Sequence, residues 1–345
     1  MSVAPDGAGS HDSNTGDRDR EPAGSVRDRV QLPDGRRAGV HMPVGLGLAK
    51  VAERSAQIGA STLQIFTDNP TAWRRRERNP DEGVEFRRLL TELDLGPVAI
   101  HAPYLVNMAG PIEELFVRSV DLVRHELEGA PDFGARFVNV HCGSHRGAGL
   151  EAGIARLVEG IEIGLGGHHS RRELPLLVLE NSSGGGNTIG VTIEELAMIL
   201  DAAAVRGIDG RLAICLDVAH LWGAGYDVSD PGEIDRLVER FDRLIGLDRL
   251  AMIHLNDSVA ARGSRHDHHT HLGDGEIGPV GLAHFLRHPA LAEVTYVMEV
   301  PDVDRGYDLV NMARLDDLLA GRPLTRGPDL PERSAGRGDG REAEE

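Results

Sequence analysis

The chain has 345 residues, of which 40% are hydrophobic and 27% charged, and its formal net charge is −18. This composition is typical of a globular protein, and no apolar run approaches the ~18 residues of a membrane span. The first residues lack the apolar stretch of a secretory signal, and two cysteines are too few for a disulfide framework. We therefore expect a cytoplasmic protein without a membrane partner, and its acidity at first argues against a nucleic-acid partner.

Both ends of the chain differ in composition from its middle. Residues 1–36 are rich in Gly, Asp, Ser, Arg and Pro without apolar periodicity, and residues 322–345 have the same character. Such segments cannot bury enough apolar surface to offset the entropy lost on ordering. The sequence therefore predicts two disordered tails around one catalytic domain at residues 37–321.

Within that domain, short apolar runs alternate with amphipathic segments. Each run is almost continuously hydrophobic, as expected for parallel strands that are covered on both faces. The eight runs lie at residues 38–43, 62–66, 97–102, 136–142, 175–180, 211–217, 249–255 and 294–300. Segments with helical spacing include residues 47–59, 85–95, 113–129, 232–246 and 307–321.

The alternation predicts the fold class. Eight strand–helix units within residues 37–321 match an α/β protein of the (β/α)8 TIM barrel type, whose usual length is about 250 residues. A doubly wound open sheet is the alternative. The count of eight favours the barrel.

Six successive strands end in side chains of the kind that bind metal ions. Active sites of such barrels lie at the carboxyl ends of the strands, so these side chains should meet at one level. Buried carboxylates need positive partners, and no Lys or Arg lies at these strand ends, so we expect metal to balance their charge. The six residues are His101, His141, Glu180, Asp217, His254 and Glu299.

Further candidate ligands lie in two loops. His220 follows three residues after Asp217, and Asp267 and His269 form a D-x-H pair in the stretch SRHDHHTHLGDG, residues 264–275. Residues two apart in an extended segment point the same way, so the pair could hold one ion. All nine groups supply nitrogen or oxygen, which suits zinc, manganese or iron. Nine ligands are enough for two or three ions.

The segments around these residues resemble the endonuclease IV family of apurinic/apyrimidinic (AP) endonucleases, which are trinuclear zinc barrels. They run from about residue 38 to 302 and read GVHMPVGLGLA, FTDNPTAW, IHAPYLVNMAG, VNVHCGSH, ENSSGGGNTIG, CLDVAHLWGAGYDV, IHLNDS, GSRHDHHTHLGDGEIG and MEVPD. The resemblance implies a zinc-dependent hydrolase of base excision repair. Its substrate would be double-stranded DNA containing abasic sites, cut at the phosphodiester 5′ to the site.

The resemblance also implies how three zinc ions share the nine ligands. The family pattern gives His101, His141 and Glu180 to the first ion, Glu180, Asp217, His254 and Glu299 to the second, and His220, Asp267 and His269 to the third. Glu180 is the expected catalytic residue, because a bridging carboxylate can orient the nucleophile or accept a proton. Three zinc ions would take the formal charge from −18 to −12 and make the mouth of the barrel locally positive.

Other residues are expected to contact DNA. Arginine beside an aromatic ring suits phosphate contact and stacking, which describes Trp73–Arg76 together with Arg262 and Arg265. A solvated loop is the alternative for the three arginines of that run. Tyr104 and Leu105 resemble the abasic-pocket and stack-penetrating positions of the family, since a hidden site must be turned out of the duplex.

The chain departs from the family pattern at four places. The pair at residues 71–72, Thr-Ala, replaces larger polar residues that enter the DNA stack. Val259, His268 and Cys142 stand where a lysine, an arginine and a proline are usual. None of these positions is an expected metal ligand, so the chemistry is better supported than the substrate.

Several histidines, glycines and cysteines receive structural expectations only. His266, His268 and His271 are expected to be solvated loop residues, and Gly273 and Gly275 to serve a turn. His41 either supports the metal site or packs as a core residue. Cys142 and Cys215 are expected to be small buried hydrophobic groups.

Two other functions fit part of this pattern. A sugar isomerase or epimerase on a related barrel needs only a Glu, Asp, His, Glu set, and it has no use for the five additional ligands. A catalytically silent, metal-stabilised barrel that binds DNA or protein is the second alternative. A monomer is the expected state of the chain.

Overall fold

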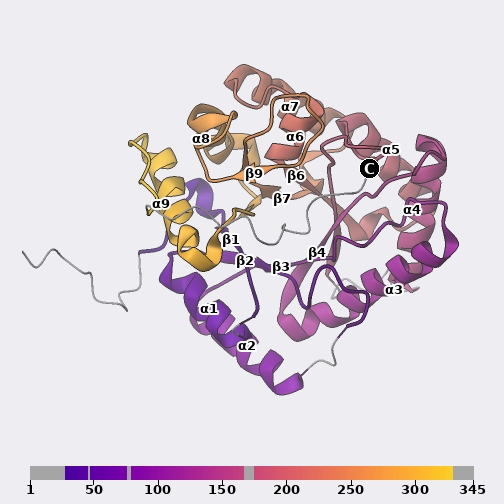
Figure 1. The fold of residues 1–345 in the computed structure, drawn as a ribbon, viewed down its shortest axis with the longest axis horizontal. Coiled ribbons are helices and arrows are strands. Elements are labelled where there is room, and N and C mark those ends of the chain that lie inside the picture. Colours follow the sequence, from indigo (N-terminus) through magenta and orange to yellow (C-terminus); the bar gives the residue numbers. More distant parts are fainter. Residues whose placement is uncertain (1–27, 46, 76–78, 167–174, 329–345) are drawn as a thin grey trace, which may run out of the picture.

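The computed structural model describes residues 28–45, 47–75, 79–166 and 175–328. Eight parallel strands form a closed barrel in the order β1-β10-β7-β6-β5-β4-β3-β2, with β1 also paired to β2 (Figure 1). Their bounds are β1 Ala38–Met42, β2 Thr62–Ile65, β3 Val98–His101, β4 Ala135–His141, β5 Leu176–Glu180, β6 Leu212–Asp217, β7 Leu250–His254 and β10 Thr295–Met298. This closure confirms the TIM barrel and excludes the open sheet.

Helices surround the barrel. They are α1 Leu48–Gln57, α2 Pro80–Glu92, α3 Glu113–Gly129, α4 Leu150–Leu165, α5 Ile193–Val205, α6 Val218–Ala224, α7 Pro231–Leu244, α8 Gly278–Arg287 and α9 Tyr307–Ala320. Short 3-10 helices lie at η1 Pro33–Gly35, η2 Ala130–Phe133, η3 Asp209–Arg211, η4 Leu247–Arg249, η5 Pro289–Leu291 and η6 Val303–Arg305. No helix among the described residues is long and apolar enough to cross a membrane.

Local sequence explains where several helices begin. Asn79 and Asp230 precede α2 and α7, and each side chain accepts a hydrogen bond from a backbone amide of the first turn. A proline follows each of them at the first helical position. This position needs no amide proton, and its φ suits proline, so cap and proline together fix the start of the helix.

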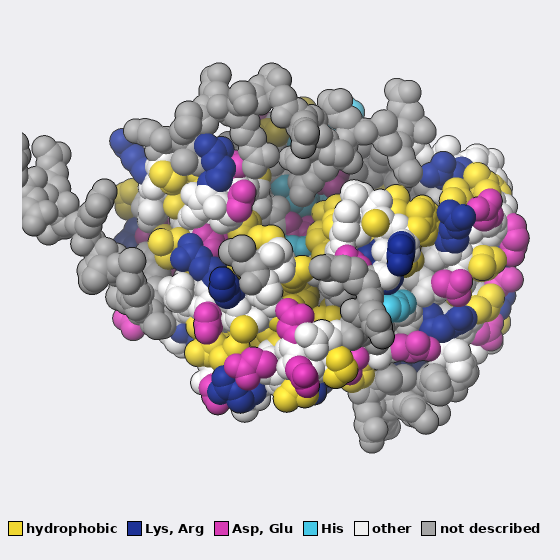
Figure 2. Space-filling view, turned by 60° about the horizontal axis from the view of Figure 1, so that its bottom comes forward, with side chains coloured by type: hydrophobic (Ala, Val, Ile, Leu, Met, Phe, Trp, Pro, Cys, Tyr) yellow, Lys and Arg dark blue, Asp and Glu magenta, His cyan; other side chains and the backbone are white. Residues whose placement is uncertain are grey.

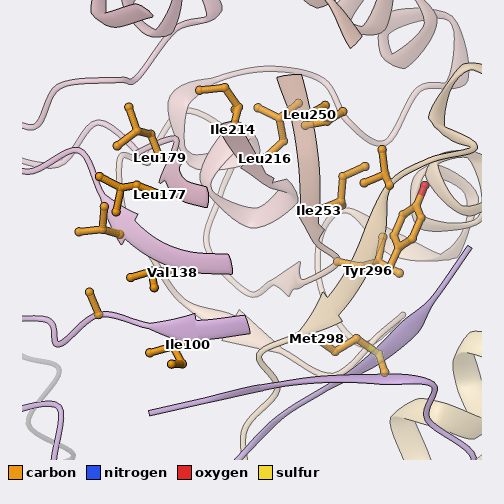
Figure 3. Packing of buried hydrophobic residues seen from close by; sticks show 14 of the residues in the cluster. Ile100, Val138, Leu177, Leu179, Ile214, Leu216, Leu250, Ile253, Tyr296 and Met298 are labelled. Atoms are coloured by element: carbon orange, nitrogen blue, oxygen red, sulfur yellow. The ribbon is translucent and has the colours of Figure 1, made fainter. Parts of the chain in front are cut away.

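The alternation of side chains along each strand places apolar and polar groups on opposite sides. Leu177 and Leu179 of β5 belong to the apolar layer between strands and helices, which Figure 3 shows around the barrel. Val178 belongs instead to a smaller cluster inside the barrel, formed by Ala99, Phe137, Val178, Ala213, Cys215, Met252 and Val297. Because the side-chain period of a strand is two, residues two or four positions further on enter the barrel at its carboxyl end.

The packed domain is longer than the predicted range of residues 37–321. Val30 and Leu32 are buried in the main apolar cluster, and the amide of Val30 donates to the Gly59 carbonyl at 3.1 Å. At the other end, Thr325 donates through its amide and hydroxyl to the Asp317 carboxylate. Both tail boundaries therefore need correction, whereas residues 1–27 and 329–345 lie outside the described residues.

Candidate metal centre

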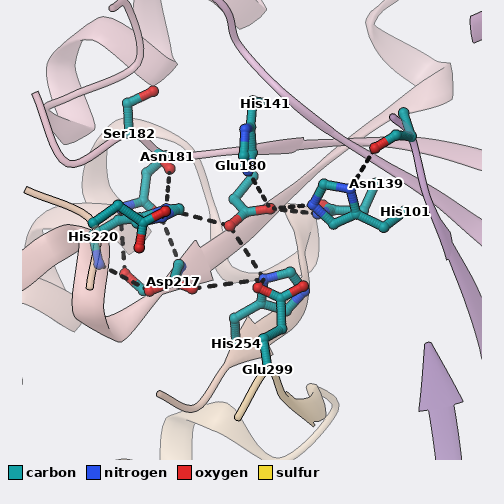
Figure 4. Close-up of polar contacts among 12 residues, drawn as sticks. His101, Asn139, His141, Glu180, Asn181, Ser182, Asp217, His220, His254 and Glu299 are labelled. Carbon is teal, nitrogen blue, oxygen red and sulfur yellow. Dashed lines mark hydrogen bonds and ion pairs between the residues drawn. The ribbon is translucent and has the colours of Figure 1, made fainter. Parts of the chain in front are cut away.

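The six strand-end side chains meet at one end of the barrel. His101, His141, Glu180, Asp217 and His254 are the last residues of β3, β4, β5, β6 and β7, and Glu299 directly follows β10. Figure 4 shows them pointing toward one another around the Glu180 carboxylate. Each is separated from an interior apolar residue of its strand by two or four positions, so the strand period explains their convergence.

The three loop ligands reach the same cluster from two elements. His220 lies on α6, whose first turn is capped by the Asp217 carboxylate at 2.8 Å from the His220 amide. His269 is the first residue of β9, His269–Thr270, and Asp267 lies two residues before it. Strand β9 pairs antiparallel with β8, Asp257–Ser258. This short ribbon turns the loop after β7 back over the strand ends.

The first group consists of two imidazoles and one carboxylate oxygen. Nε2 of His101 lies 3.4 Å from Oε2 of Glu180, and Nε2 of His141 lies 3.7 Å from the same oxygen. The ligand atoms of the three residues all lie within 4.8 Å of one another. This spacing is compatible with one shared ion.

The second group is built around His254. Its Nδ1 lies 3.2 Å from Oε1 of Glu180, 3.4 Å from Oε2 of Glu299 and 3.7 Å from Oδ2 of Asp217. Glu180 therefore faces the first group with one oxygen and the second with the other. A carboxylate in this position can bridge two ions.

The third group joins the loop ligands to Asp217. Nε2 of His269 lies 2.9 Å from Asp267 and 3.5 Å from Asp217, and Nε2 of His220 lies 3.1 Å from Asp267. The other ring nitrogen of His220, Nδ1, lies 2.9 Å from the Asn181 carbonyl. This contact fixes the ring with Nε2 toward the group. Asp217 thus touches both the second and the third group.

Charges in the cluster oppose the effect of burial. Burial alone would raise the pKa of Glu180, but the imidazoles of His254 and His141 hold this pKa well below its usual value. Burial would likewise lower the pKa of His220, but Asp217 and Asp267 raise it well above its usual value. Without metal, Glu180 is therefore ionised and His220 protonated, whereas burial outweighs the neighbouring carboxylates at His141 and lowers its pKa. A metal ion competes with protons for the same atoms.

Two observations test whether the residues suit a metal ion. Nε2 of His269 is buried and makes no hydrogen bond with any described residue, although two carboxylates lie close. The donor set contains imidazole nitrogen and carboxylate oxygen, which zinc and manganese accept. The Cys215 thiol also lies within 4.8 Å of ligand atoms of Glu180 and His254, but burial raises its pKa to about 12. In the metal-free protein the thiol is therefore protonated, and the nitrogen and oxygen set fits a metal.

Four amide side chains complete the site, and the sequence analysis did not single them out. Gln64 on β2 contacts His254 and Glu299, and Asn139 on β4 donates to Glu180. Asn181 accepts from the Asp217 amide at 2.7 Å. Asn256 donates to the Asp217 carboxylate and accepts from the Glu299 amide, both at 2.7 Å. Asn181 lies one position after Glu180, and Asn256 lies two positions after His254. Their closeness in sequence to expected ligands could therefore have indicated both residues.

The remaining histidines have distinct environments. His41 places Nδ1 3.3 Å from the Glu299 carboxylate, so it supports the cluster. His266 and His268 are exposed, as expected for loop residues. His271 is different, because its ring stacks on Tyr307 with centroids 3.9 Å apart. The expectation of a solvated His271 was therefore wrong, and the stack joins the loop to α9.

Gly273 and Gly275 serve the loop as expected, for two separate reasons. Gly273 has a φ of +83°, which side chains rarely adopt. A Cβ at Gly275 would lie 2.4 Å from the Asp257 carboxylate. Asp257 accepts backbone amides from both glycines, so the absence of a side chain at Gly275 permits this contact.

The residues that are expected to contact DNA lie on the rim of the barrel and differ in how exposed their side chains are. Tyr104 is 45% exposed, and its ring centroid is 5.9 Å from that of His101; Leu105 follows it and is half-buried. Trp73 packs partly on the core beneath the Arg118 guanidinium, and Arg265 is exposed.

Two of the other arginines near the rim have partners on the protein. Arg262 pairs with Asp227 and lies over the Trp222 ring, so it is less available for phosphate. Arg75 donates to the carbonyls of Asn69 and Ala72, which ties it to its own loop. Arg76 lies outside the described residues.

Figure 2 shows histidine and acidic side chains inside a hollow of the molecular surface. A closed barrel with such a cluster at the carboxyl ends of its strands defines a metal-dependent barrel enzyme.

Comparison with known proteins specifies the family. The chain matches the xylose isomerase-like TIM barrel family over residues 52–318. It is 36% identical over 283 residues to a protein of Halothermothrix orenii named probable endonuclease 4, covering 81% of this chain and 100% of the relative. Endonuclease IV from Thermus thermophilus matches with a TM-score of 0.72 at 35% identity, covering 83% of this chain and 99% of that structure. The chain belongs to the endonuclease IV family within the xylose isomerase-like TIM barrels.

A D-tagatose 3-epimerase-like protein shares the fold at a lower level. Its TM-score is 0.56 at 19% identity, with 82% of this chain and 97% of that structure covered. At this identity the likeness concerns the barrel and carries no argument about activity. The sugar epimerase alternative therefore gains no support beyond the shared fold.

Proposed function

We propose that the protein is a zinc-dependent endonuclease that hydrolyses the phosphodiester 5′ to abasic sites in double-stranded DNA. Family membership supports DNA cleavage. The observation that carries the proposal is the convergence of all nine nitrogen and oxygen ligands on three adjoining groups that share Glu180 and Asp217. A sugar isomerase would need only the second of these groups.

The three groups supply the ligands of three ions. His101, His141 and Glu180 would hold the first, Glu180, Asp217, His254 and Glu299 the second, and His220, Asp267 and His269 the third. Asp217 touches the third group as well, so it is a second candidate bridge. The ions, when bound, supply a nucleophile from water near neutral pH and neutralise charge on the phosphate.

Glu180 is the proposed catalytic residue. It is fully buried, and both its oxygens face imidazoles of neighbouring groups. Its lowered pKa keeps it ionised at neutral pH, so the carboxylate can hold metal and orient the attacking water. Asn139 donates to Oε2 and fixes the plane of the carboxylate.

The rim residues are proposed to position the DNA. Tyr104 presents an exposed ring beside His101, which suits contact with a nucleotide turned out of the duplex. Leu105, Trp73 and Arg265 are proposed to contact the strand around it. We further propose that the protein is a monomer and acts in the cytoplasm.

Cleavage of a defined duplex tests the proposal. The zinc-loaded protein is incubated with an oligonucleotide duplex that carries one tetrahydrofuran abasic analogue, and the products are separated on a denaturing gel. The analogue cannot undergo β-elimination, so every cut is hydrolytic. We expect one cut on the 5′ side, leaving a 3′-hydroxyl, and near-complete loss of cutting in Glu180→Gln.

Glu128→Gln provides the control, because Glu128 is exposed on α3 and lies outside the cluster. It should cut at the wild-type rate. An intact strand with zinc-loaded wild-type protein would contradict the endonuclease proposal. Binding to the abasic duplex without cutting would favour a silent DNA-binding barrel, and a chain that holds a single ion would favour a sugar isomerase.

A further inference from the structure

A second group of metal-ligand side chains lies on the helical wall of the barrel. Asp235 on α7 faces His284 on α8 and His288, the residue directly after α8. Nε2 of His284 lies 2.6 Å from Oδ1 of Asp235, and Nε2 of His288 lies 3.3 Å from the same oxygen. The three ligand atoms lie within 4.8 Å of one another.

Local structure explains why the two histidines face the same carboxylate. They are four residues apart, with His284 in α8 and His288 at its C-cap, so their side chains lie about one helical turn apart. His288 also starts the short helix η5, where its Nδ1 accepts the Ala290 amide at 3.3 Å. The ring therefore has a restricted orientation. Helices α7 and α8 are neighbours in the barrel wall (Figure 1).

This group is separate from the cluster at the strand ends. The His288 carbonyl accepts two hydrogen bonds from Arg36, each 3.3 Å long. Arg36 precedes β1 by two residues, so His288 lies near the amino ends of the strands, opposite to the cluster. None of the nine ligands that are proposed for DNA cleavage therefore belongs to this group.

We propose that Asp235, His284 and His288 form a peripheral site for one divalent transition-metal ion such as zinc. Two imidazole nitrogens and one carboxylate oxygen make a three-ligand zinc set with an open fourth position for water. Neighbouring ligand atoms around tetrahedral zinc lie about 3.3 Å apart, given bonds of about 2.0 Å. The Asp235–His288 distance already matches this value. The Asp235–His284 distance must open, and Asp235 is 53% exposed and free to adjust.

Binding at this site has one identifiable cost. In its neutral form His288 accepts at Nδ1 and carries its proton on Nε2, the atom that faces Asp235. Metal binding at Nε2 moves the proton to Nδ1 and removes the 3.3 Å bond to the Ala290 amide. The site should therefore bind more weakly than the buried cluster, and an ion in it would join α7 to α8.

Zinc stoichiometry of the full chain tests the site. Metal-free wild-type protein is dialysed to equilibrium against a series of free zinc concentrations, and zinc per chain is determined by elemental analysis. We expect a final, weaker equivalent that is absent in the double variant His284→Gln/His288→Gln and in Asp235→Asn. Glu239→Gln is the matched control, because Glu239 is exposed on α7 one turn after Asp235.

The control should bind as many zinc ions as the wild type, and all variants should keep the wild-type rate of DNA cleavage. Equal zinc content in the wild type and the double variant, with matching circular dichroism spectra, would overturn the proposal. Retention of the weak equivalent by Asp235→Asn alone would show that the carboxylate is no ligand. That result would also contradict the three-ligand site.

Discussion

Gln64 lies between two of the charged groups of the metal centre. Its Oε1 is 3.1 Å from Nε2 of His254, and its Nε2 donates to Glu299 at 2.7 Å. By accepting a hydrogen bond from Nε2–H of His254, Gln64 favours the neutral tautomer in which Nδ1 can bind a metal ion. We predict that Gln64→Leu weakens zinc binding by about 10- to 100-fold, as measured by competition with a chelator of known affinity.

Gln57→Leu makes the same chemical change at an exposed position of α1. Its zinc affinity should equal that of the wild type, so a loss in Gln64→Leu cannot be assigned to a general effect of leucine. Wild-type affinity in Gln64→Leu would show that His254 keeps the required tautomer without help from the amide.

The contrast between Glu180 and Gln64 shows what the sequence reveals about single residues. Glu180 was predictable, because a carboxylate at the end of an apolar strand has no structural explanation without a positive partner. Gln64 is equally buried but neutral, and a polar residue inside an apolar strand can be satisfied in many ways. Only the three-dimensional arrangement brings it against His254. The prediction for His271 was wrong for a similar reason, because its stacking partner Tyr307 is distant in sequence.

The loop after β7 is organised by one buried carboxylate. Asp257 accepts the amides of Ser258, Gly273 and Ile277 at 2.8 to 3.1 Å. Its bonds hold the two ends of the segment that carries Asp267 and His269. We predict that Asp257→Ala lowers the free energy of unfolding by about 2 kcal/mol, because several buried amides lose their acceptor. Zinc content should fall by one equivalent, since the third group loses its geometry.

Urea denaturation and elemental analysis would measure the two effects. Asp257→Asn keeps one oxygen acceptor and should lose less stability than Asp257→Ala. Asp201→Ala removes an exposed carboxylate of α5 and should change neither quantity. A full zinc complement in Asp257→Ala would mean that the loop reaches its position without this carboxylate.

At the scale of elements, periodicity predicted the long segments and missed the short ones. The eight strand positions were correct because each combines an apolar run with turn residues on both sides. The pair β8 and β9 has two residues per strand, too few for any period. Val30 and Leu32 were assigned to a tail for the same reason, since two apolar residues in a polar segment do not reveal that they pack on the barrel.

At the scale of the whole molecule, closure of the barrel concentrates charge at one end. Six strand ends, helix α6 and the loop after β7 deliver four carboxylates and five imidazoles to adjoining groups. When no metal ion is bound, the imidazoles with raised pKa values, those of His220, His254 and His269, balance the carboxylates by holding protons. The stability of the metal-free protein should therefore depend on the protonation of these imidazoles, whereas the stability of the zinc-loaded protein should not.

The imidazoles give the sign of that dependence. Burial would lower the pKa of His269, but Asp267 and Asp217 raise it to about 9, and the pKa values of His220 and His254 are also raised. A group whose pKa is raised by folding stabilises the folded state below its unfolded value of about 6.5. This contribution is lost as the pH rises through the folded value. Chelated protein should thus become less stable between pH 6.5 and 9.

Zinc reverses this trend, because it binds the deprotonated imidazoles and its affinity increases with pH. We predict that the difference in Tm between zinc-loaded and chelated protein widens from pH 6.5 to pH 9, as followed by circular dichroism at fixed free zinc. The measurement is best made on His284→Gln/His288→Gln, so that the peripheral site contributes nothing. A difference that stays constant or narrows over this range would mean that the metal-free cluster does not hold its protons on the imidazoles.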